Sequence, residues 1–423
     1  MKPLLDIIAR HKRGQAVGIY SLCSAHPWVI EAAMHVAKAS GSPLLIEATC
    51  NQVNQFGGYT GLTPADFRRF VETIALRAAF PLERLWLGGD HLGPNVWQKE
   101  KAAAAMAHSD ELVSQYVAAG FRKIHLDCSM ACADDPSTLP ERVVATRAAR
   151  LCAIAERTWQ QQGGEPPAYV IGTEVPTPGG AAEELEQLAV TTPESAQATI
   201  AAHRMAFTEA GLDAVWPRII ALVVQPGVEF DHHKVVDYRP ENARVLSAFI
   251  ARDAQFVFEA HSTDYQTPEN LRALVRDHFA ILKVGPGATF ALRETLWALA
   301  AIEHELPGID QRSDLRETVL RVMRADPRHW RSHYRDAATE PLDLAYSLSD
   351  RIRYYWPHPD VQQASTALLS NLRNHPLPLT LVSQYLPRQY AAIRAGQLEA
   401  SVDALLGDGI ASALRPYERA CTS

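Results

Sequence analysis

The chain has 423 residues, of which 47% are hydrophobic and 21% charged, a composition typical of a globular protein with room for one large domain and an appendage. Its net charge of -7, without a dense run of Lys or Arg, excludes nucleic acid and anionic membranes as expected partners. The longest apolar windows, such as 219–224, are too short to span a bilayer, and the N-terminal residues show no secretory signal.

Six cysteines are spread along the chain, and none of them forms a Cys-x-x-Cys pair. This usage predicts reduced thiols and a cytoplasmic protein. Cys128 and Cys132 are close enough in sequence to suggest a metal site or a disulfide, but small packed side chains are the better interpretation.

Short β-rich apolar runs alternate with longer segments of helical period, a pattern typical of repeated βα units. The expected strands cover 17–21, 43–48, 85–88, 123–127, 169–172, 218–224, 256–259 and 279–284. Helices are expected between them, for example at 27–39, 64–77, 109–119, 193–210 and 289–305. Several begin with a proline in the first turn, and three of these follow a threonine cap: Pro27, Pro64, Pro193, Pro268, Thr63, Thr192 and Thr267.

Eight strands that each precede a helix, over about 290 residues, predict a (βα)8 TIM barrel. An open doubly wound sheet is the alternative, but it usually has fewer strands and a Gly-rich dinucleotide turn, which this sequence lacks. We therefore expect a barrel over 1–305 and a helical C-terminal extension over 306–423.

The extension contains a cluster of arginines and aromatic residues: Arg351, Arg353, Tyr354, Tyr355 and Trp356. Such residues are enriched at protein interfaces. They could equally pack against the barrel of the same chain, and the sequence leaves both interpretations open.

Polar residues stand at the end of each expected strand. They occur in the segments 24–26, 47–52, 90–91, 125–127, 173–174, 225–229, 261–264 and 283–287. The carboxyl ends of barrel strands converge on one mouth, so residues distant in sequence become neighbours there. The sequence therefore predicts an active-site rim.

Histidine and carboxylate side chains in such a mouth are typical ligands of Zn²⁺ with an open coordination position. The candidate ligands are His91 and His261, with Glu174 as a third. Asp90 is the candidate acid/base, and Glu174 could share this role. For a single histidine a structural role is the commoner one, and His125 is expected to be structural because it lies deeper in its strand.

Two features at the eighth strand suggest other chemistry. Lys283 could form a Schiff base in a metal-free aldolase, although a lysine there is more often an ion-pair partner. The turn Gly285-Pro-Gly287 resembles a backbone nest for phosphate, and a simple tight turn explains it equally well.

Long motifs at 45–61, 88–94 (Gly88-Gly-Asp-His-Leu-Gly-Pro94), 172–176, 224–231 and 259–266 closely resemble the Z-type subunit of tagatose-1,6-bisphosphate aldolase. This is the GatZ/KbaZ family of galactitol and N-acetylgalactosamine catabolism, with the closer likeness on the KbaZ side. The likeness covers essentially the whole chain, including 349–357 and 383–387.

The resemblance implies a cytoplasmic TIM-barrel protein that is non-catalytic alone. It would support the activity and stability of a separate class II, zinc-dependent catalytic Y subunit, within an oligomer. The complex cleaves tagatose 1,6-bisphosphate reversibly to dihydroxyacetone phosphate and glyceraldehyde 3-phosphate.

The family is also distantly similar to the catalytic class II aldolases. Their acid/base Asp and zinc His are matched by Asp90 and His91, their fifth-strand Glu by Glu174, and a further zinc His by His261. The zinc His expected after the sixth strand is Gln225 here. The Gly-rich loop after the seventh strand is Ser-Thr-Asp-Tyr-Gln, and Gly285 replaces an Asn.

The competing class is a stand-alone metal-dependent aldolase or epimerase of a ketose or its phosphate, which the retained acid and histidines favour. In either case the residues expected to contact a sugar or sugar phosphate are Asn51, Gln52, Gln225, Ser262, Asp264, Lys283, Gly285 and Gly287. A tagatose-6-phosphate kinase has no support, because the sequence contains neither a P-loop nor a sugar-kinase glycine pattern.

Overall fold

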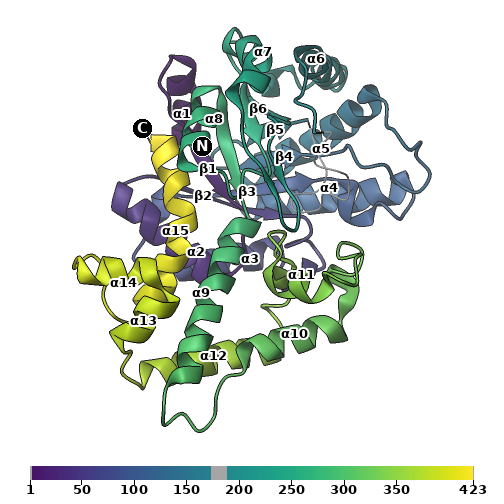
Figure 1. Ribbon diagram of the computed structural model, residues 1–423. Helices are drawn as coiled ribbons and strands as arrows, with labels where there is room; N and C mark the ends of the chain where they lie inside the picture. The colour runs from purple at the N-terminus through teal and green to yellow at the C-terminus, as the bar shows by residue number, and fades with distance from the viewer. Residues whose placement is uncertain (1, 173–187, 423) are drawn as a thin grey trace.

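The computed structural model describes residues 2–172 and 188–422. Eight parallel strands close into a barrel in the order β1-β10-β9-β6-β5-β4-β3-β2 (Figure 1). These strands are β1 (Ile19–Leu22), β2 (Leu44–Thr49), β3 (Leu85–Leu92), β4 (Lys123–Leu126), β5 (Ala168–Ile171), β6 (Ile219–Val224), β9 (Val257–Ala260) and β10 (Phe279–Val284). The TIM barrel expected from the sequence is confirmed, and each expected strand is present.

Helices surround the strands and continue beyond them. The first nine are α1 (Lys2–Lys12), α2 (Pro27–Ser40), α3 (Pro64–Arg77), α4 (Ala102–Ala118), α5 (Glu141–Gln162), α6 (Pro193–Glu209), α7 (Pro240–Ala251), α8 (Pro268–Arg276) and α9 (Pro286–Glu305). The extension adds α10 (Leu315–Ala325), α11 (Glu340–Tyr346), α12 (Pro359–Arg373), α13 (Leu379–Tyr385), α14 (Pro387–Arg394) and α15 (Val402–Thr422). A short antiparallel pair, β7 (Glu229–Phe230) and β8 (Val235–Val236), follows β6.

The expected helix starts are confirmed at the prolines. Each of the three threonine hydroxyls accepts a backbone N–H from the first turn, Thr63 from Asp66, Thr192 from Ser195 and Thr267 from Asn270. Two boundaries differ, because α4 begins at Ala102 rather than near 109 and α9 begins at Pro286 rather than at 289. A run of alanines has high helix propensity but no polar face, so it gives little periodic signal.

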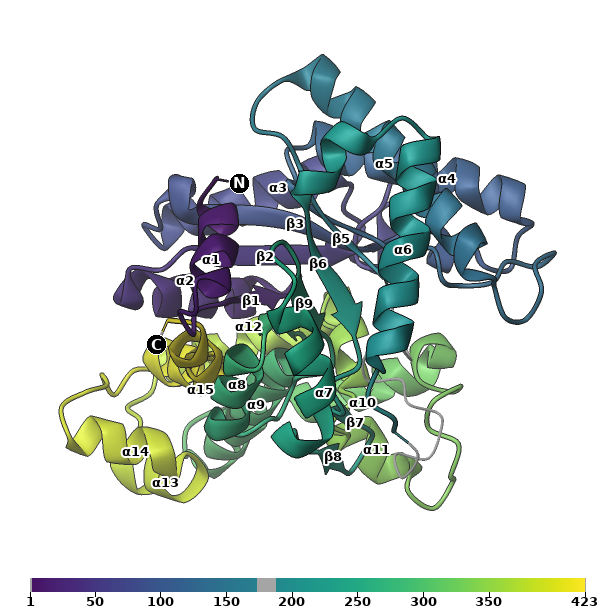
Figure 2. The same cartoon turned by 90° about the horizontal axis from the view of Figure 1, so that it is seen from above.

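The end of the barrel opposite the mouth is closed by α1. Leu4 and Ile8 of this helix are buried in a cluster with Ile19, Trp86 and Ile220 from the beginnings of the strands. A larger core fills the space between the strands and the outer helices. Figure 2 shows α4, α5 and α6 on one side of the strands and α8, α9 and α15 on the other.

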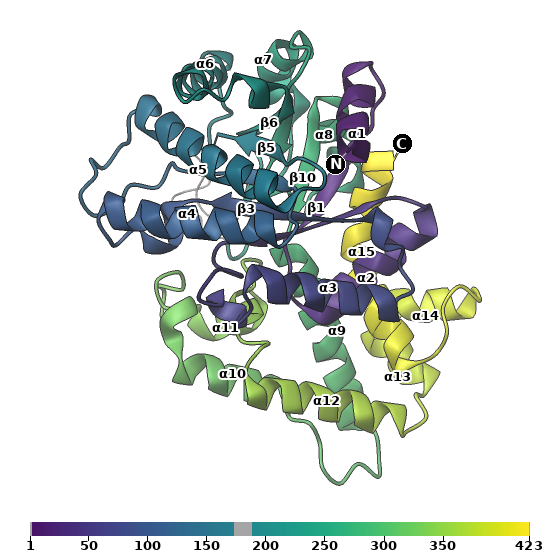
Figure 3. The same ribbon diagram turned by 180° about the vertical axis from the view of Figure 1, so that it is seen from behind.

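The last helix belongs to the ring of helices around the barrel. The eighth barrel helix, α9, runs away from the strands and carries the extension (Figures 1 and 3). In its place α15 contacts α2, α8 and β1. The backbone N–H of Gly18 donates to the carbonyl of Cys421, 2.9 Å away. The C-terminal helices expected from the sequence are thus present, while a domain division at 305/306 stays a prediction.

Within the described ranges, no helix is long and apolar enough to cross a membrane. All six cysteines are free, and Cys128 and Cys132 are buried, consistent with packed thiols.

Candidate active site at the barrel mouth

Strand β3 carries the two residues on which the site is built. It extends to Leu92, beyond the expected end, and its pairing with β4 shifts register between Gly89 and Leu92. His91 adopts a φ of 48°, in the left-handed region that non-glycine residues rarely occupy. Such a conformation costs about 1–3 kcal/mol and is characteristic of functional sites. The irregularity lets the adjacent Asp90 and His91 side chains both reach the mouth.

Four buried residues form what we call the histidine cluster: Asp90, His91, His125 and His261. One potential ligand atom from each lies within 4.8 Å of the others. The His91 ring centroid is 4.9 Å from that of His261 and 5.0 Å from that of His125. Nε2 of His91 and Nδ1 of His261 are buried without a hydrogen-bond partner among the described residues. The cluster could therefore hold a metal ion.

The remaining ring nitrogens of the two histidines are fixed by carboxylates. Nδ1 of His91 lies 2.7 Å from Asp127 Oδ2, and Nε2 of His261 lies 3.0 Å from Glu259 Oε1. A carboxylate behind a histidine sets the tautomer and the ring orientation of a metal ligand. The sequence reasoning did not assign this role to either carboxylate, although each lies two residues from a site position and so shares its face of the chain.

The surroundings shift the pKa values of the two histidines in opposite directions. Burial alone would lower the pKa of His91, but the Asp90 and Asp127 carboxylates outweigh it and raise this pKa to about 9. Burial lowers the pKa of His261 to about 4, against the opposing effect of Glu259. His261 is therefore a neutral ring at pH 7, the form that binds a metal, whereas His91 is protonated and would release its proton when a metal binds.

His125 has a mixed role. Its Nε2 lies 3.0 Å from the carbonyl of Gly172, and its Nδ1 lies 2.9 Å from Asp90 Oδ1. The ring is fully buried, as expected for a structural histidine deep in the strand. His125 nevertheless belongs to the histidine cluster, a role that the sequence reasoning did not assign to it.

Directly below the histidine cluster lies an ion network of two lysines and two glutamates: Lys123, Lys283, Glu47 and Glu259. Lys123 Nζ is 2.6 Å from Glu47 and 2.7 Å from Glu259, and neither side chain of these pairs is exposed. Lys283 contacts the same two glutamates and lies 2.8 Å from Asp90 Oδ1. Buried charges of this kind require such partners.

Gly88 makes room for this network. It is in register with Glu47 on β2 and with Lys123 on β4. A Cβ atom at Gly88 would lie 2.7 Å from Oε1 of Glu47. Glycine is therefore required where the glutamate side chain crosses the neighbouring strand.

The network argues against Lys283 as a Schiff-base lysine. Burial would lower the pKa of Lys283, but Asp90, Glu259 and Glu47 outweigh it and hold the pKa well above its ordinary value. A nucleophilic lysine must be neutral. Lys283 is instead a charged ion-pair partner, the alternative favoured by the sequence.

The glycine turn after β10 is already filled by a protein carboxylate. Asp264 Oδ1 accepts the backbone N–H groups of Gly285 and Gly287 at 2.9 and 2.7 Å. Burial raises the pKa of Asp264 to about 6. A Cβ atom at Gly287 would lie 2.9 Å from the same oxygen. The N–H donors expected to bind phosphate thus bind Asp264 instead.

The other expected contact residues divide into two groups. Asn51, Gln52, Ser262 and Lys283 line the mouth cavity. Gln225 does not, because its Oε1 accepts the N–H groups of residues 227 and 228 in its own loop. Glu174 lies outside the described residues.

The mouth cavity has a volume of about 90 Å³ and is partly covered by the extension. Arg353 and Tyr354, in the 3-10 helix η7 (Arg351–Tyr354), line it beside His91, His261 and Asp264. The Tyr354 ring lies 4.7 Å from that of Tyr59 in the loop after β2. Part of the arginine–aromatic cluster therefore packs against the barrel of its own chain.

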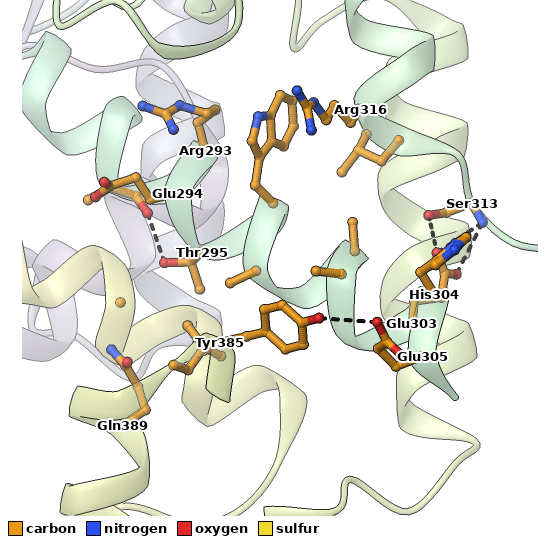
Figure 4. A pocket seen from close by; sticks show the side chains of 18 of the residues that line it. Arg293, Glu294, Thr295, Glu303, His304, Glu305, Ser313, Arg316, Tyr385 and Gln389 are labelled. Carbon is orange, nitrogen blue, oxygen red and sulfur yellow. Dashed lines mark hydrogen bonds between the residues drawn. The ribbon is translucent and has the colours of Figure 1, made fainter. Parts of the chain in front are cut away.

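A larger cavity of about 780 Å³ lies away from the mouth, between α9 and the helices of the extension (Figure 4). Two pairs of its polar residues bond with each other, Ser313 with Glu303 and Tyr385 with Glu305. It contains no part of the histidine cluster. We therefore place the chemistry at the mouth despite its smaller volume.

Comparison with known proteins identifies the family. The family model of D-tagatose-1,6-bisphosphate aldolase subunit GatZ/KbaZ-like proteins matches residues 4–422. The chain belongs to this family. The resemblance expected from the sequence motifs is confirmed.

A solved member gives the same fold. The crystal structure of a probable tagatose 6 phosphate kinase from Sinorhizobium meliloti 1021 is 48% identical, covers 96% of this chain and 100% of its own, and superposes with a TM-score of 0.88. A fructose-bisphosphate aldolase from Campylobacter jejuni is 15% identical, over 87% of this chain and 91% of its own, with a TM-score of 0.40.

Proposed function

We propose that this GatZ/KbaZ-like chain is an accessory subunit of a class II tagatose-1,6-bisphosphate aldolase in tagatose 6-phosphate catabolism. Its role would be to support the activity and stability of a separate zinc-dependent catalytic subunit. The family match over 4–422 carries the proposal, because the family is described as an aldolase subunit. Two departures from a catalytic class II site support it: Gln225 replaces a zinc histidine and turns into its own loop, and Asp264 fills the phosphate nest.

The donor set fits a divalent metal in this chain too. His91 and His261 would hold the ion through the two buried nitrogens that lack a partner. A bound metal of this kind polarises a carbonyl group of the substrate. Whether this chemistry occurs here or only in the catalytic subunit separates the two candidate functions.

Asp90 is the chain's own candidate for moving a proton. Burial would raise the pKa of Asp90, but Lys283 and His91 outweigh it and keep the pKa well below its ordinary value. Asp90 is therefore a carboxylate at pH 7, able to accept a proton from a substrate carbon or hydroxyl. Lys283 and His125, 2.8 and 2.9 Å from its Oδ1, hold it in place.

The second candidate function is a stand-alone metal-dependent aldolase or epimerase acting on a ketose or ketose phosphate. One observation favours it: the mouth retains a buried acid and two histidines with free nitrogens, which scaffolding alone does not require. The carboxylates that orient the two histidines, Asp127 and Glu259, are also present and favour the same function.

One experiment separates the two functions. The chain is purified alone and with a co-expressed class II aldolase chain, and cleavage of tagatose 1,6-bisphosphate is assayed with Zn²⁺ present. An accessory subunit co-purifies with the aldolase, raises its activity and is inactive alone. Cleavage or interconversion of ketoses by the chain alone would overturn the accessory role.

A matched pair of variants tests the cluster itself. His91→Ala combined with His261→Ala should abolish stoichiometric zinc, measured by elemental analysis. His108→Ala, a partly exposed histidine on α4, should leave zinc content unchanged. If the double variant retains both its metal and its activation of the aldolase, the histidine cluster is not the site.

A further inference from the structure

A second chamber adjoins the mouth cavity. It has a volume of about 470 Å³ and lies between α2, α3 and the extension helix α12. Four residues line both spaces: Cys23, Gln52, Tyr59 and Arg353. We call it the side chamber, and the four shared residues mark where the two spaces meet.

The mouth cavity is too small for a whole sugar phosphate, and the side chamber is large enough for most of one. The mouth cavity, at about 90 Å³, is large enough for only a few water molecules. The side chamber falls in the range of about 300–1,000 Å³ typical of small-molecule sites. A six-carbon sugar phosphate with its reacting end at the histidine cluster must therefore extend into the side chamber.

Charge determines which end lies where. Three aspartates, Asp90, Asp127 and Asp264, line the mouth cavity, and its lysine, Lys283, is already paired with carboxylates. The charged residues of the side chamber are Arg77, Arg353 and Glu31. His91 adds one positive charge to the mouth, but the three aspartates there outnumber it. A phosphate dianion is therefore favoured on the side-chamber face of Arg353 over the aspartate-lined mouth.

Arg353 is available for an anion. Its NH1 donates to the Asp350 carbonyl at 3.0 Å and also to that of Ser349, and its NH2 lies 3.2 Å from the Tyr354 hydroxyl. In the described ranges it forms no ion pair with a carboxylate side chain. A guanidinium has five N–H donors, so Nε and one N–H of NH2 remain for a phosphate.

The walls of the side chamber suit the carbon chain and hydroxyls of a sugar. His26 stands between Trp28 and Trp356, with ring centroids 5.2 and 5.7 Å away. Trp356 is 5% exposed, yet its indole N–H has no acceptor among the described residues, and Nδ1 of His26 likewise has no partner. Buried polar atoms normally have partners, which ligand hydroxyls would supply.

We propose that the side chamber binds the phosphate-bearing end of an open-chain ketose monophosphate, with Arg353 as the charge partner and the opposite end at the histidine cluster. The ketose part of this proposal rests on the proposed function. A second phosphate has no place at the mouth, because Asp264 occupies the N–H donors of Gly285 and Gly287. The chain itself thus selects a monophosphate over a bisphosphate.

The test is isothermal titration of the zinc-loaded full chain with D-tagatose, D-tagatose 6-phosphate and D-tagatose 1,6-bisphosphate. The monophosphate should bind at least about tenfold more tightly than D-tagatose, and the bisphosphate no more tightly than the monophosphate. Arg353→Ala should bind D-tagatose 6-phosphate no more tightly than D-tagatose, and its affinity for D-tagatose should stay within about twofold of the wild-type value. Arg353→Lys should restore part of the tighter binding of the phosphate.

Two further variants complete the test. Arg328→Ala removes an equal charge from an exposed position on the extension and should change no affinity. Trp356→Phe keeps a ring in the chamber but removes the N–H, so all three sugars should bind several-fold more weakly.

Three results would overturn the proposal. The bisphosphate could bind tenfold more tightly than the monophosphate, or Arg353→Ala could lose affinity equally for D-tagatose and D-tagatose 6-phosphate. The third result is that none of the three sugars binds. Failure of the proposed function looks different. In that case the chain would bind sugars in the expected order but would not raise the activity of a class II aldolase.

Discussion

The ion network and the histidine cluster are neighbouring layers of one barrel, but their polar atoms are satisfied differently. In the ion network each lysine contacts two glutamates, so the charges balance within the protein. In the histidine cluster one nitrogen of His91 and one of His261 have no partner among the described residues. Lys123 Nζ also makes no hydrogen bond of good geometry, but two carboxylates lie within 2.7 Å of it, whereas no described residue bonds to the two histidine nitrogens. Burial alone therefore does not mark a functional site; convergent metal-type ligand atoms without a bonded partner are the stronger indication.

The carboxylates of the two layers extend this comparison. The lysines Lys123 and Lys283 outweigh burial and hold the pKa of Glu259 well below its ordinary value. Among the residues that the structure describes, no cation pairs with Glu229, beside the mouth; its hydrogen-bond contacts there are Ser262 and the Phe230 N–H. Burial raises the pKa of Glu229 to about 7. Whether a cation lies next to the buried carboxylate therefore decides whether its pKa is lowered or raised.

The largest expected effect comes from breaking the ion network. Lys123→Met leaves Glu47 and Glu259 buried with one cation fewer, and removing one partner of a buried ion pair costs about 3–5 kcal/mol. Urea unfolding should show this loss, while Lys99→Met, at an exposed position, should change stability by less than about 0.5 kcal/mol. A loss below about 1 kcal/mol for Lys123→Met would mean that the network is not stabilising.

The next largest effect concerns metal binding by the histidine cluster. Saturating Zn²⁺, at about 100–1,000 times its dissociation constant, should stabilise the chain by about 3–4 kcal/mol, and chelation should remove this gain. His261→Ala should lose most of this metal dependence, measured by urea unfolding with and without Zn²⁺. Equal stabilisation of the wild type and His261→Ala would contradict the assignment of the ligand.

The lone carboxylate gives a pH dependence of predictable sign. The pKa of Glu229, about 7 in the folded chain, lies above the ordinary value of 4.5, so the folded state binds the proton more tightly. The free energy of unfolding should therefore fall by about 2–3 kcal/mol on this account as pH rises from about 5 to about 8. Glu229→Gln should remove that fall in urea titrations, whereas Glu209→Gln, an exposed control, should keep it. Parallel pH profiles of stability for wild type and Glu229→Gln would rule out Glu229 as the source of this pH dependence.

The smallest expected effect comes from a helix cap that lies outside both layers. Thr63→Ala removes the capping box of α3 and should cost about 1 kcal/mol without altering zinc content. Thr73→Ala, in the middle of the same helix, serves as the matched control and should be close to neutral. A change in metal content after Thr63→Ala would show that the outer helices are coupled to the mouth.

The barrel could be predicted from sequence because each strand carries its own local signal. An apolar run such as 219–224 followed by a polar turn needs no knowledge of its neighbours. The same signal located Asp90, His91 and His261, which follow such runs directly. Lys123 was missed, although it begins a buried strand and alternates with His125 toward the same face.

Other parts of the site depend on contacts between distant segments, which one sequence cannot reveal. Gly285 and Gly287 form the expected turn, but only the folded chain shows that Asp264 fills it. Arg353 comes from the extension, and its position over the mouth follows from how η7 packs against the loop after β2. Gln225 stands at the right strand end but bonds to its own loop.

The return of α15 to the barrel has a consequence for how the protein is made. The Tyr417 hydroxyl donates to the carbonyl of Thr263, 2.6 Å away, in the loop that follows His261. A nascent chain that already contains all eight strands therefore still lacks a helix of its outer ring and an anchor for this loop. Contacts between segments so far apart in sequence form slowly. Metal-binding competence should consequently appear only after synthesis of the last helix, which makes the mouth one of the last parts of the molecule to mature.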